Sequence, residues 1–168
     1  MKDGFTINEV SVLSESLINE EIKSPVYRDA LKFELGSSET IDISVMVRNF
    51  FNSQPHWLLS IMINIVSKNK LKKSLERNNF TQGSKVGRWT VAKANKREIV
   101  FGESLGFIEH RLSFCKINDD KNEFMTMSSV KTHNNFGKFY FFFVKLVHMK
   151  LVKFALNNMY RAKCKGAT

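Results

Sequence analysis

Three of the four histidines, together with the two cysteines, are the side chains of this sequence whose types could do chemistry. His110, His133 and His148 lie in the C-terminal half of the chain, where folding could bring them together as metal ligands. No two of them have the i, i+3 or i, i+4 spacing that places ligating side chains on one helix face. We therefore expect no metal site.

Neither cysteine has the surroundings of a nucleophile. Cys115 lies in an apolar stretch and Cys164 near the C-terminal end, and no histidine is placed beside either of them by a catalytic spacing. Two cysteines are also too few for a disulfide scaffold, which favours a reducing, cytoplasmic location. The sequence has no phosphate-binding glycine loop, nucleophile elbow or dinucleotide fingerprint, so we expect no cofactor.

His110 is the strongest candidate for a polar group that points into a cavity. Residues 107–117 read as a strand, and alternation along it places His110, Leu112 and Phe114 on one face. An imidazole among apolar neighbours can serve a ligand, or it can be a structural group bonded to a backbone carbonyl. The sequence leaves both interpretations open.

The remaining candidates are residues whose structural and binding roles coincide. Asn134 most simply caps the helix that follows it, with ligand contact as the alternative. The large apolar side chains are core residues by default, but a cavity under a helix is lined by those same positions. The candidate ligand-binding residues are Trp89, His110, Phe114, Met125, Met127, Asn134, Tyr140, Val144 and His148.

A long amphipathic helix, predicted over residues 137–161, must position several of these side chains. No proline and no further glycine interrupts the stretch, and at about 100° per residue its side chains separate into two groups. The group expected to be buried is Tyr140, Val144, Val147, Leu151, Phe154 and Ala155. The opposite, basic group is Lys138, Lys145, Lys150, Lys153, Asn157 and Arg161.

The preceding chain is predicted to supply the surface that buries this helix. Helices over residues 43–52 and 57–68 form a hairpin across Pro55, and Lys68–Lys73 ends the second one with positive charge. Strands are expected at 26–35, 88–93, 98–102, 107–117 and 123–132. This order predicts an α+β, helix-grip domain over residues 26–165, with a curved antiparallel sheet around the terminal helix and an N-terminal arm at 1–25.

The charge of the chain is strongly uneven. Its formal net charge is +10, yet the first 42 residues hold nine acidic and only four basic side chains. A basic helix face could meet phosphate on a nucleic acid or a membrane, although a solvated face is the more ordinary explanation. With 43% apolar and 25% charged residues, the composition is that of a globular protein, and no apolar run is long enough to span a bilayer.

Short motifs spread over residues 26–160 resemble a known family. They are Tyr27-Arg28-Asp29-Ala30, Phe50-Phe51 with Pro55-His56-Trp57, Gly83 to Gly87 with Trp89, Gly102 before His110-Arg111-Leu112-Ser113-Phe114, His133-Asn134 with Gly137-Lys138 and Tyr140, and His148 ahead of Leu151-Val152. This set resembles an uncharacterised bacterial domain-of-unknown-function family within the START-like, polyketide-cyclase-like (SRPBCC, helix-grip) superfamily. The resemblance implies a helix-grip fold with a hydrophobic cavity under the terminal helix, and it brings no established reaction.

Three functions remain open on this reading. The first is non-catalytic binding of an apolar or lipid-like small molecule, with His110 or Tyr140 fixing its orientation. The second is a cyclase-like or hydrolase-like enzyme that uses His110 as general base. The third is a basic protein that contacts a nucleic acid or, transiently, a membrane surface. We expect the first and do not expect nucleic-acid binding, because the lysines are not interleaved with aromatic residues in a recognisable binding motif.

Overall fold

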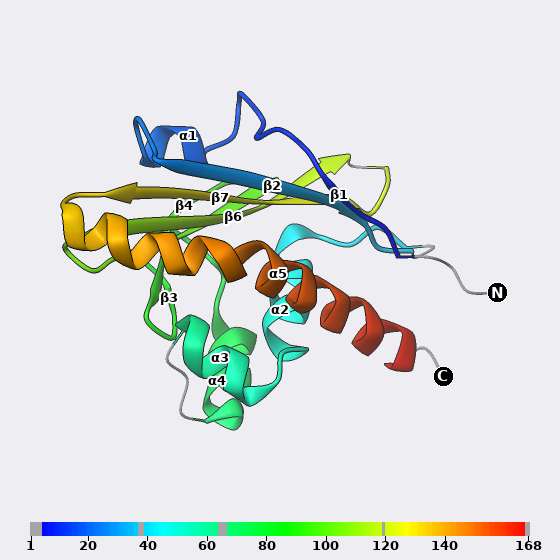
Figure 1. Cartoon of the computed structure of the whole chain (residues 1–168). Coiled ribbons are helices and arrows are strands. Elements are labelled where there is room, and N and C mark those ends of the chain that lie inside the picture. Colours follow the sequence, from blue (N-terminus) through cyan, green and yellow to red (C-terminus); the bar gives the residue numbers. More distant parts are fainter. Residues whose placement is uncertain (1–4, 37–38, 64–66, 119, 167–168) are drawn as a thin grey trace.

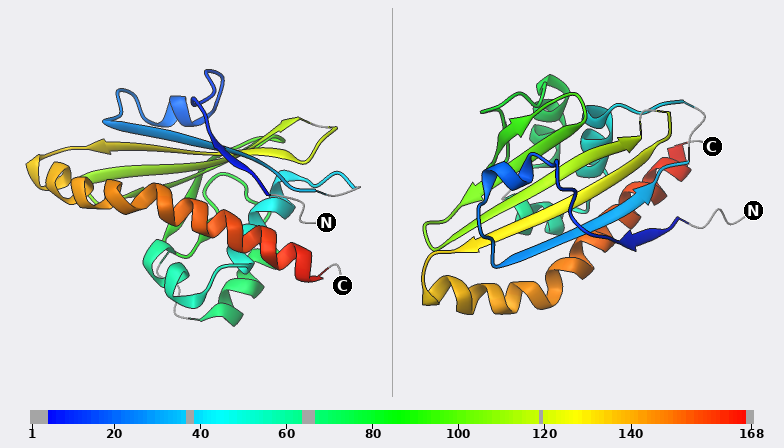
Figure 2. Two further views of the ribbon diagram at one scale, coloured as in Figure 1. Left: turned by 45° about the vertical axis from the view of Figure 1, so that its right-hand side comes forward. Right: turned by 90° about the horizontal axis from the view of Figure 1, so that it is seen from above.

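The protein is an α+β domain built on a curved, seven-stranded antiparallel sheet, as the sequence predicted (Figure 1). The structure is a computed structural model that describes residues 5–36, 39–63, 67–118 and 120–166. A long C-terminal helix lies along one face of the sheet, and a short helix near the N-terminus covers the other (Figure 1, Figure 2).

The sheet has the strand order β1-β2-β7-β6-β5-β4-β3. Its strands are β1 (Ile7–Glu9), β2 (Tyr27–Glu34), β3 (Lys85–Val86), β4 (Trp89–Ala94), β5 (Glu98–Ser104), β6 (Ile108–Asn118) and β7 (Glu123–Thr132). The five longer strands lie where the sequence predicted them. Strands β1 and β3 were missed because two or three residues are too short to show an alternating pattern.

Because β2 pairs with β7, segments from opposite ends of the domain are neighbours. In this register Phe33 lies opposite Phe124, and in the adjacent pair His110 lies opposite Val130. Strands β2 and β3 lie near opposite edges of the sheet. The chain between them leaves the sheet, forms helices beneath it and returns at the far edge (Figure 1).

Among the described residues, five helices accompany the sheet: α1 (Ile18–Glu21), α2 (Ile43–Asn52), α3 (His56–Ile63), α4 (Lys68–Arg77) and α5 (Asn135–Gly166). The break between α2 and α3 at Pro55 is as predicted. The prediction that Lys68–Lys73 ends the second helix is wrong, because that run begins α4. Leu71 and Leu75, one turn apart, are buried, so the lysines occupy the outer face of a separate helix.

The buried face of α5 is rotated from the one that the sequence predicted, and the two faces share Ala155. The residues that pack into the domain are Phe141, Val152, Ala155, Leu156 and Met159. Tyr140, Val147 and Phe154, which were expected inside, are 41%, 49% and 41% exposed. Residues 139–144 are all apolar, so the pattern at the start of the helix could not decide which side turns inward.

Phenylalanine rings fill the space between the sheet and the helices. The rings of Phe50 and Phe114 are 4.8 Å apart, and Phe51 contacts Phe101 at 5.6 Å. Buried Gln54 joins α2 to α5, because its amide donates hydrogen bonds to the carbonyls of Phe50 at 2.6 Å and Ala155 at 3.0 Å. No helix in the described ranges combines the length and hydropathy needed to cross a membrane.

Residues 12–18 of the N-terminal arm pack onto the sheet face opposite α5. Glu98 accepts hydrogen bonds from the Ser16 hydroxyl at 2.6 Å and the Leu17 backbone N–H at 2.9 Å. Ile18 is fully buried there, in a cluster that includes Met125 and Met127. The arm is therefore an integral layer of the domain rather than an appendage.

The rotated face of α5 can be tested with two identical substitutions on one helix. Leu156→Ala should lower the free energy of unfolding by about 2–5 kcal/mol, because it empties a fully buried position. Leu146→Ala, at a position 62% exposed, should stay within about 0.5 kcal/mol of the parent. Urea denaturation of both variants measures the difference, and equal losses would contradict the orientation of α5.

Candidate functional site

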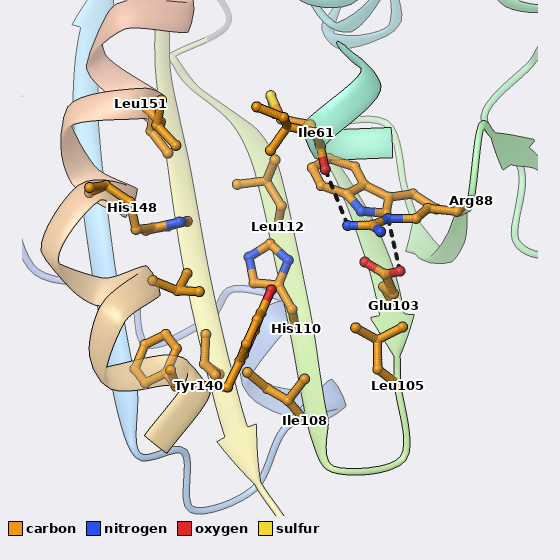
Figure 3. A pocket seen from close by; sticks show the side chains of 17 residues that line it. Ile61, Arg88, Glu103, Leu105, Ile108, His110, Leu112, Tyr140, His148 and Leu151 are labelled. Atoms are coloured by element: carbon orange, nitrogen blue, oxygen red, sulfur yellow. Dashed lines mark hydrogen bonds and ion pairs between the residues drawn. The ribbon is translucent and has the colours of Figure 1, made fainter. Parts of the chain in front are cut away.

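A cavity of about 240 Å³ lies between the first half of α5 and the sheet (Figure 3). It is lined by Ile61, Met62, Arg88, Trp89, Glu103, Leu105, Ile108, His110, Leu112, Val130, Tyr140, Phe141, Val144, Val147, His148, Leu151 and Val152. The walls are mostly apolar, and the polar side chains are few. Such a lining is typical of a site for a small organic molecule.

His110 projects from β6 into the centre of this site (Figure 3). Its ring lies between those of Trp89 and His148, with centroids 5.9 and 5.8 Å away. Burial, aided by the positive charges of His148, Arg111 and Arg88, lowers the pKa of His110 to about 3. The imidazole is therefore neutral near pH 7, with one nitrogen able to donate a hydrogen bond and the other able to accept one.

Two buried polar atoms at the cavity have no hydrogen-bond partner among the described residues: His110 Nε2 and Trp89 Nε1. An unpaired buried polar group costs about 1–3 kcal/mol, so each such group in a native protein calls for an explanation. Both residues line the same cavity, so two polar atoms without a protein partner belong to side chains of its wall.

His148 is held in place from the sheet. Its Nε2 lies 3.0 Å from Ser128 Oγ on β7 and 3.4 Å from Asp29 Oδ2 on β2. The Tyr27 hydroxyl donates to the same Asp29 oxygen at 2.6 Å. Burial lowers the pKa of His148, while the Asp29 carboxylate acts in the opposite direction. These contacts tie α5 across two strands and fix the position of the His148 ring beside His110.

An ion pair forms the wall opposite α5. Arg88 Nε lies 2.9 Å from Glu103 Oε1, and the Arg88 guanidinium also reaches the Ile61 carbonyl at 3.4 Å (Figure 3). Because the Glu103 carboxylate neutralises the charge of the guanidinium, Arg88 attracts a second carboxylate less than an unpaired arginine would.

Five of the nine candidate residues line the cavity: Trp89, His110, Tyr140, Val144 and His148. Phe114 shares the face of β6 with His110, as predicted, but it lies deeper, in the phenylalanine core. Met125 and Met127 lie on the opposite face of β7 under α1, and neither lines this cavity. Asn134 Oδ1 accepts a hydrogen bond from the Gly137 N–H at 2.8 Å, which is the capping role that the sequence favoured.

Sequence reasoning missed Asp29, Ser128 and the Arg88–Glu103 pair. Their partners lie on other elements, far away in the sequence, so no short sequence motif predicts these contacts. Two of them had a signal: Asp29 lies in the Tyr27-Arg28-Asp29-Ala30 motif, and Arg88 immediately precedes the candidate Trp89.

The other reactive groups do not join this site. His133 is paired with Glu109, Nε2 to Oε1 3.1 Å, away from His110 and His148. Burial, and then the charge of Glu98, raise the pKa of the Cys115 thiol to about 12, which leaves no reactive thiolate near pH 7. Within the described parts of the chain, no group of three or more His, Cys, Asp or Glu side chains is arranged to hold a metal ion.

The low pKa of His110 predicts how stability depends on pH. As pH falls below about 6.5, the unfolded chain protonates this histidine while the folded chain does not until about pH 3. The unfolded state then binds more protons, so the free energy of unfolding should fall by up to about 1.4 kcal/mol per pH unit from this group.

Urea denaturation between about pH 6.5 and about pH 5 measures this slope. His110→Phe should flatten it, and His133→Phe, which removes an exposed histidine, should leave it unchanged. Parallel slopes for the parent and His110→Phe would show that His110 titrates normally.

The comparisons with known proteins give a family and nothing finer. Residues 22–155 match the model of a family described as protein of unknown function (DUF2867). No curated protein and no solved structure matches the chain. The matched segment contains β2 to β7 and the cavity-lining part of α5. This chain is a member of the DUF2867 family.

Proposed function

We propose that this protein binds an apolar or amphipathic small molecule, without transforming it, in the cavity between the sheet and α5. The observation that carries the proposal is the pair of unpartnered buried atoms, His110 Nε2 and Trp89 Nε1, at an otherwise largely apolar cavity. An apolar body would fill the cavity, and one polar atom would complete the hydrogen bonding of its wall.

The cavity bounds the size of the guest. A volume of about 240 Å³ equals roughly eight times the share of liquid volume that one water molecule takes. This suits a molecule with on the order of ten non-hydrogen atoms, near the lower limit of ordinary ligand sites. A medium-chain or single-ring compound fits this description better than a full-length lipid.

The electrostatics favour a neutral polar group on the guest. Burial of a carboxylate requires a charged partner, yet His110 stays neutral and Arg88 is engaged by Glu103. A hydroxyl or carbonyl oxygen needs only hydrogen bonds, which the indole N–H and the imidazole can provide.

An enzyme that uses His110 as general base is the alternative, and the geometry favours it less. A base with a pKa of about 3 is a weak proton acceptor at neutral pH, where a catalytic base works best with a pKa near the ambient pH. The nearby carboxylate, Asp29, contacts His148 rather than His110. Binding needs neither basicity nor a carboxylate beside His110.

The proposal includes a placement in the START-like, SRPBCC superfamily and in a bacterial cytoplasm. A curved antiparallel sheet around a long terminal helix supports the superfamily. The absence of a disulfide between the two cysteines, Cys115 and Cys164, supports a reducing compartment.

Binding can be tested with three probes of one chain length: 1-octanol, octanoate and octylamine. Isothermal titration should show the tightest binding for the neutral alcohol. His110→Phe should weaken octanol binding by about 1–3 kcal/mol through one lost hydrogen bond. Val144→Trp should abolish binding by filling the cavity, and His133→Phe is the matched control that should bind like the parent.

Native mass spectrometry of protein purified from its own cells supplies the second measurement. Retained small-molecule mass that Val144→Trp lacks would support the proposal. No binding of any probe, together with no retained mass, would refute it. A retained compound that is converted to product by the parent but not by His110→Phe would establish the enzyme instead.

A further inference from the structure

The first half of α5 presents an apolar surface that no described part of the chain covers. It consists of Phe136, Phe139, Phe142, Phe143 and Leu146, each between 54% and 65% exposed, and we call it the α5 apolar face. Isolated exposed apolar residues are ordinary, but a contiguous set on one element marks an interaction site.

The geometry shows that this face is continuous and turned outward. At about 100° per residue, the five side chains fall within roughly 120° of the helix circumference. Neighbouring rings contact one another, with centroids 5.1 Å apart for Phe139–Phe143 and 5.4 Å for Phe142–Phe143. The other side of the same turns packs against the sheet through Phe141, so the helix cannot rotate to bury both sides.

The charge around this face is positive. Lys138 and Lys145 are exposed on the same turns and Lys150 on the next one, and none of the three forms an ion pair with a described residue. Between Lys138 and Lys165 the sequence contains seven Lys and Arg residues and no Asp or Glu. On the neighbouring strands, Asp29 and Glu109 are each engaged by a histidine.

We propose that the α5 apolar face docks on the surface of an anionic lipid bilayer. A helix with aromatic and aliphatic side chains outward and lysines at their margin suits the boundary between acyl chains and anionic headgroups. The lysine stems are long enough to keep their ammonium groups at headgroup level while the rings are buried.

Two other occupants fit the observations less well. A second copy of this chain, docked through the same face, would bring two rows of lysines together without acidic partners. Sites for single-stranded nucleic acid place stacking aromatic rings along a positively charged groove, whereas this face is the outer surface of a helix.

The same face borders the cavity. Tyr140, Val147 and Leu105 line the cavity and are also 41%, 49% and 43% exposed. A docked molecule would therefore hold this rim against the bilayer. Docking itself rests on the α5 apolar face alone and does not require that the cavity binds a ligand.

Vesicle flotation of the full chain tests the proposal. Vesicles of phosphatidylcholine with about one quarter phosphatidylglycerol should bind the parent, and vesicles of phosphatidylcholine alone should bind it far less. Phe139→Ser/Phe142→Ser should reduce binding at least tenfold at every salt concentration, because it removes two inserted rings. Lys138→Glu/Lys145→Glu should reduce it about tenfold or more at low salt and little at high salt.

The matched controls are one double apolar-to-serine variant on α2 and α3 and one double lysine-to-glutamate variant on α4. Val45→Ser/Trp57→Ser alters two apolar residues that are 42% and 50% exposed, and Lys72→Glu/Lys73→Glu reverses two exposed lysines. Both should bind like the parent, as should Val144→Trp, which separates docking from cavity binding. Thermal melting confirms that each variant is folded.

Three results would overturn the proposal. In the first, the parent does not bind anionic vesicles. In the second, the control variants lose as much vesicle binding as the α5 variants do. In the third, sedimentation shows a dimer that Phe139→Ser/Phe142→Ser dissociates, and the protein does not bind vesicles. Binding of a single-stranded oligonucleotide, lost in the same variants and without vesicle binding, would assign the face to nucleic acid.

Discussion

The packing of α5 across the concave side of the sheet is the contact on which the rest of the structure depends. Its C-terminal half is buried against α2 and the sheet through Ala155, Leu156 and Met159. A fully buried Leu or Met side chain contributes on the order of 1.5–3 kcal/mol, which is a large part of the stability of a domain this size. Gln54 adds a directional link, because its amide bonds to backbone carbonyls of both helices.

The first half of α5 packs differently, and that difference produces the cavity. Phe141 is the large side chain buried there, and His110 and His148 line the space between this half of the helix and β6 together with apolar side chains such as Leu112. The His148 contacts to Ser128 and Asp29 hold the helix at a fixed place over the sheet. These polar contacts of His148 therefore hold the helix on the sheet where the apolar packing is incomplete.

The three sides of α5 therefore have three different environments. Its inner side completes the core, its flank lines the cavity, and its outer side forms the α5 apolar face beside exposed lysines. These surfaces meet at Tyr140 and Val147, which line the cavity and reach solvent. The same geometry accounts for both proposals, since an apolar guest and an acyl-chain boundary would meet the protein at adjoining positions.

The sequence by itself determined the order of the five longer strands and of α2, α3 and α5, and most of their boundaries. Alternation marked the long strands, Pro55 separated two helices, and Asn134 identified the start of α5. These features depend on local periodicity, turn chemistry and capping, which are properties of neighbouring residues. The placement of His110, Leu112 and Phe114 on one face followed for the same reason.

Only the tertiary structure decided which sides face each other. Residues 139–144 are apolar all round, so the rotation of α5 came from packing against the sheet and not from periodicity. Alternation along β7 separates Met125 and Met127 from Phe124, but it does not say which of the two faces lies under α1. Only the packing of α1 on the sheet assigns Met125 and Met127 to that face. The contact of Asp29 with His148 joins segments from opposite ends of the domain, because β2 pairs with β7 and α5 crosses both strands. The two residues are far apart in the sequence, so their spacing does not predict the contact.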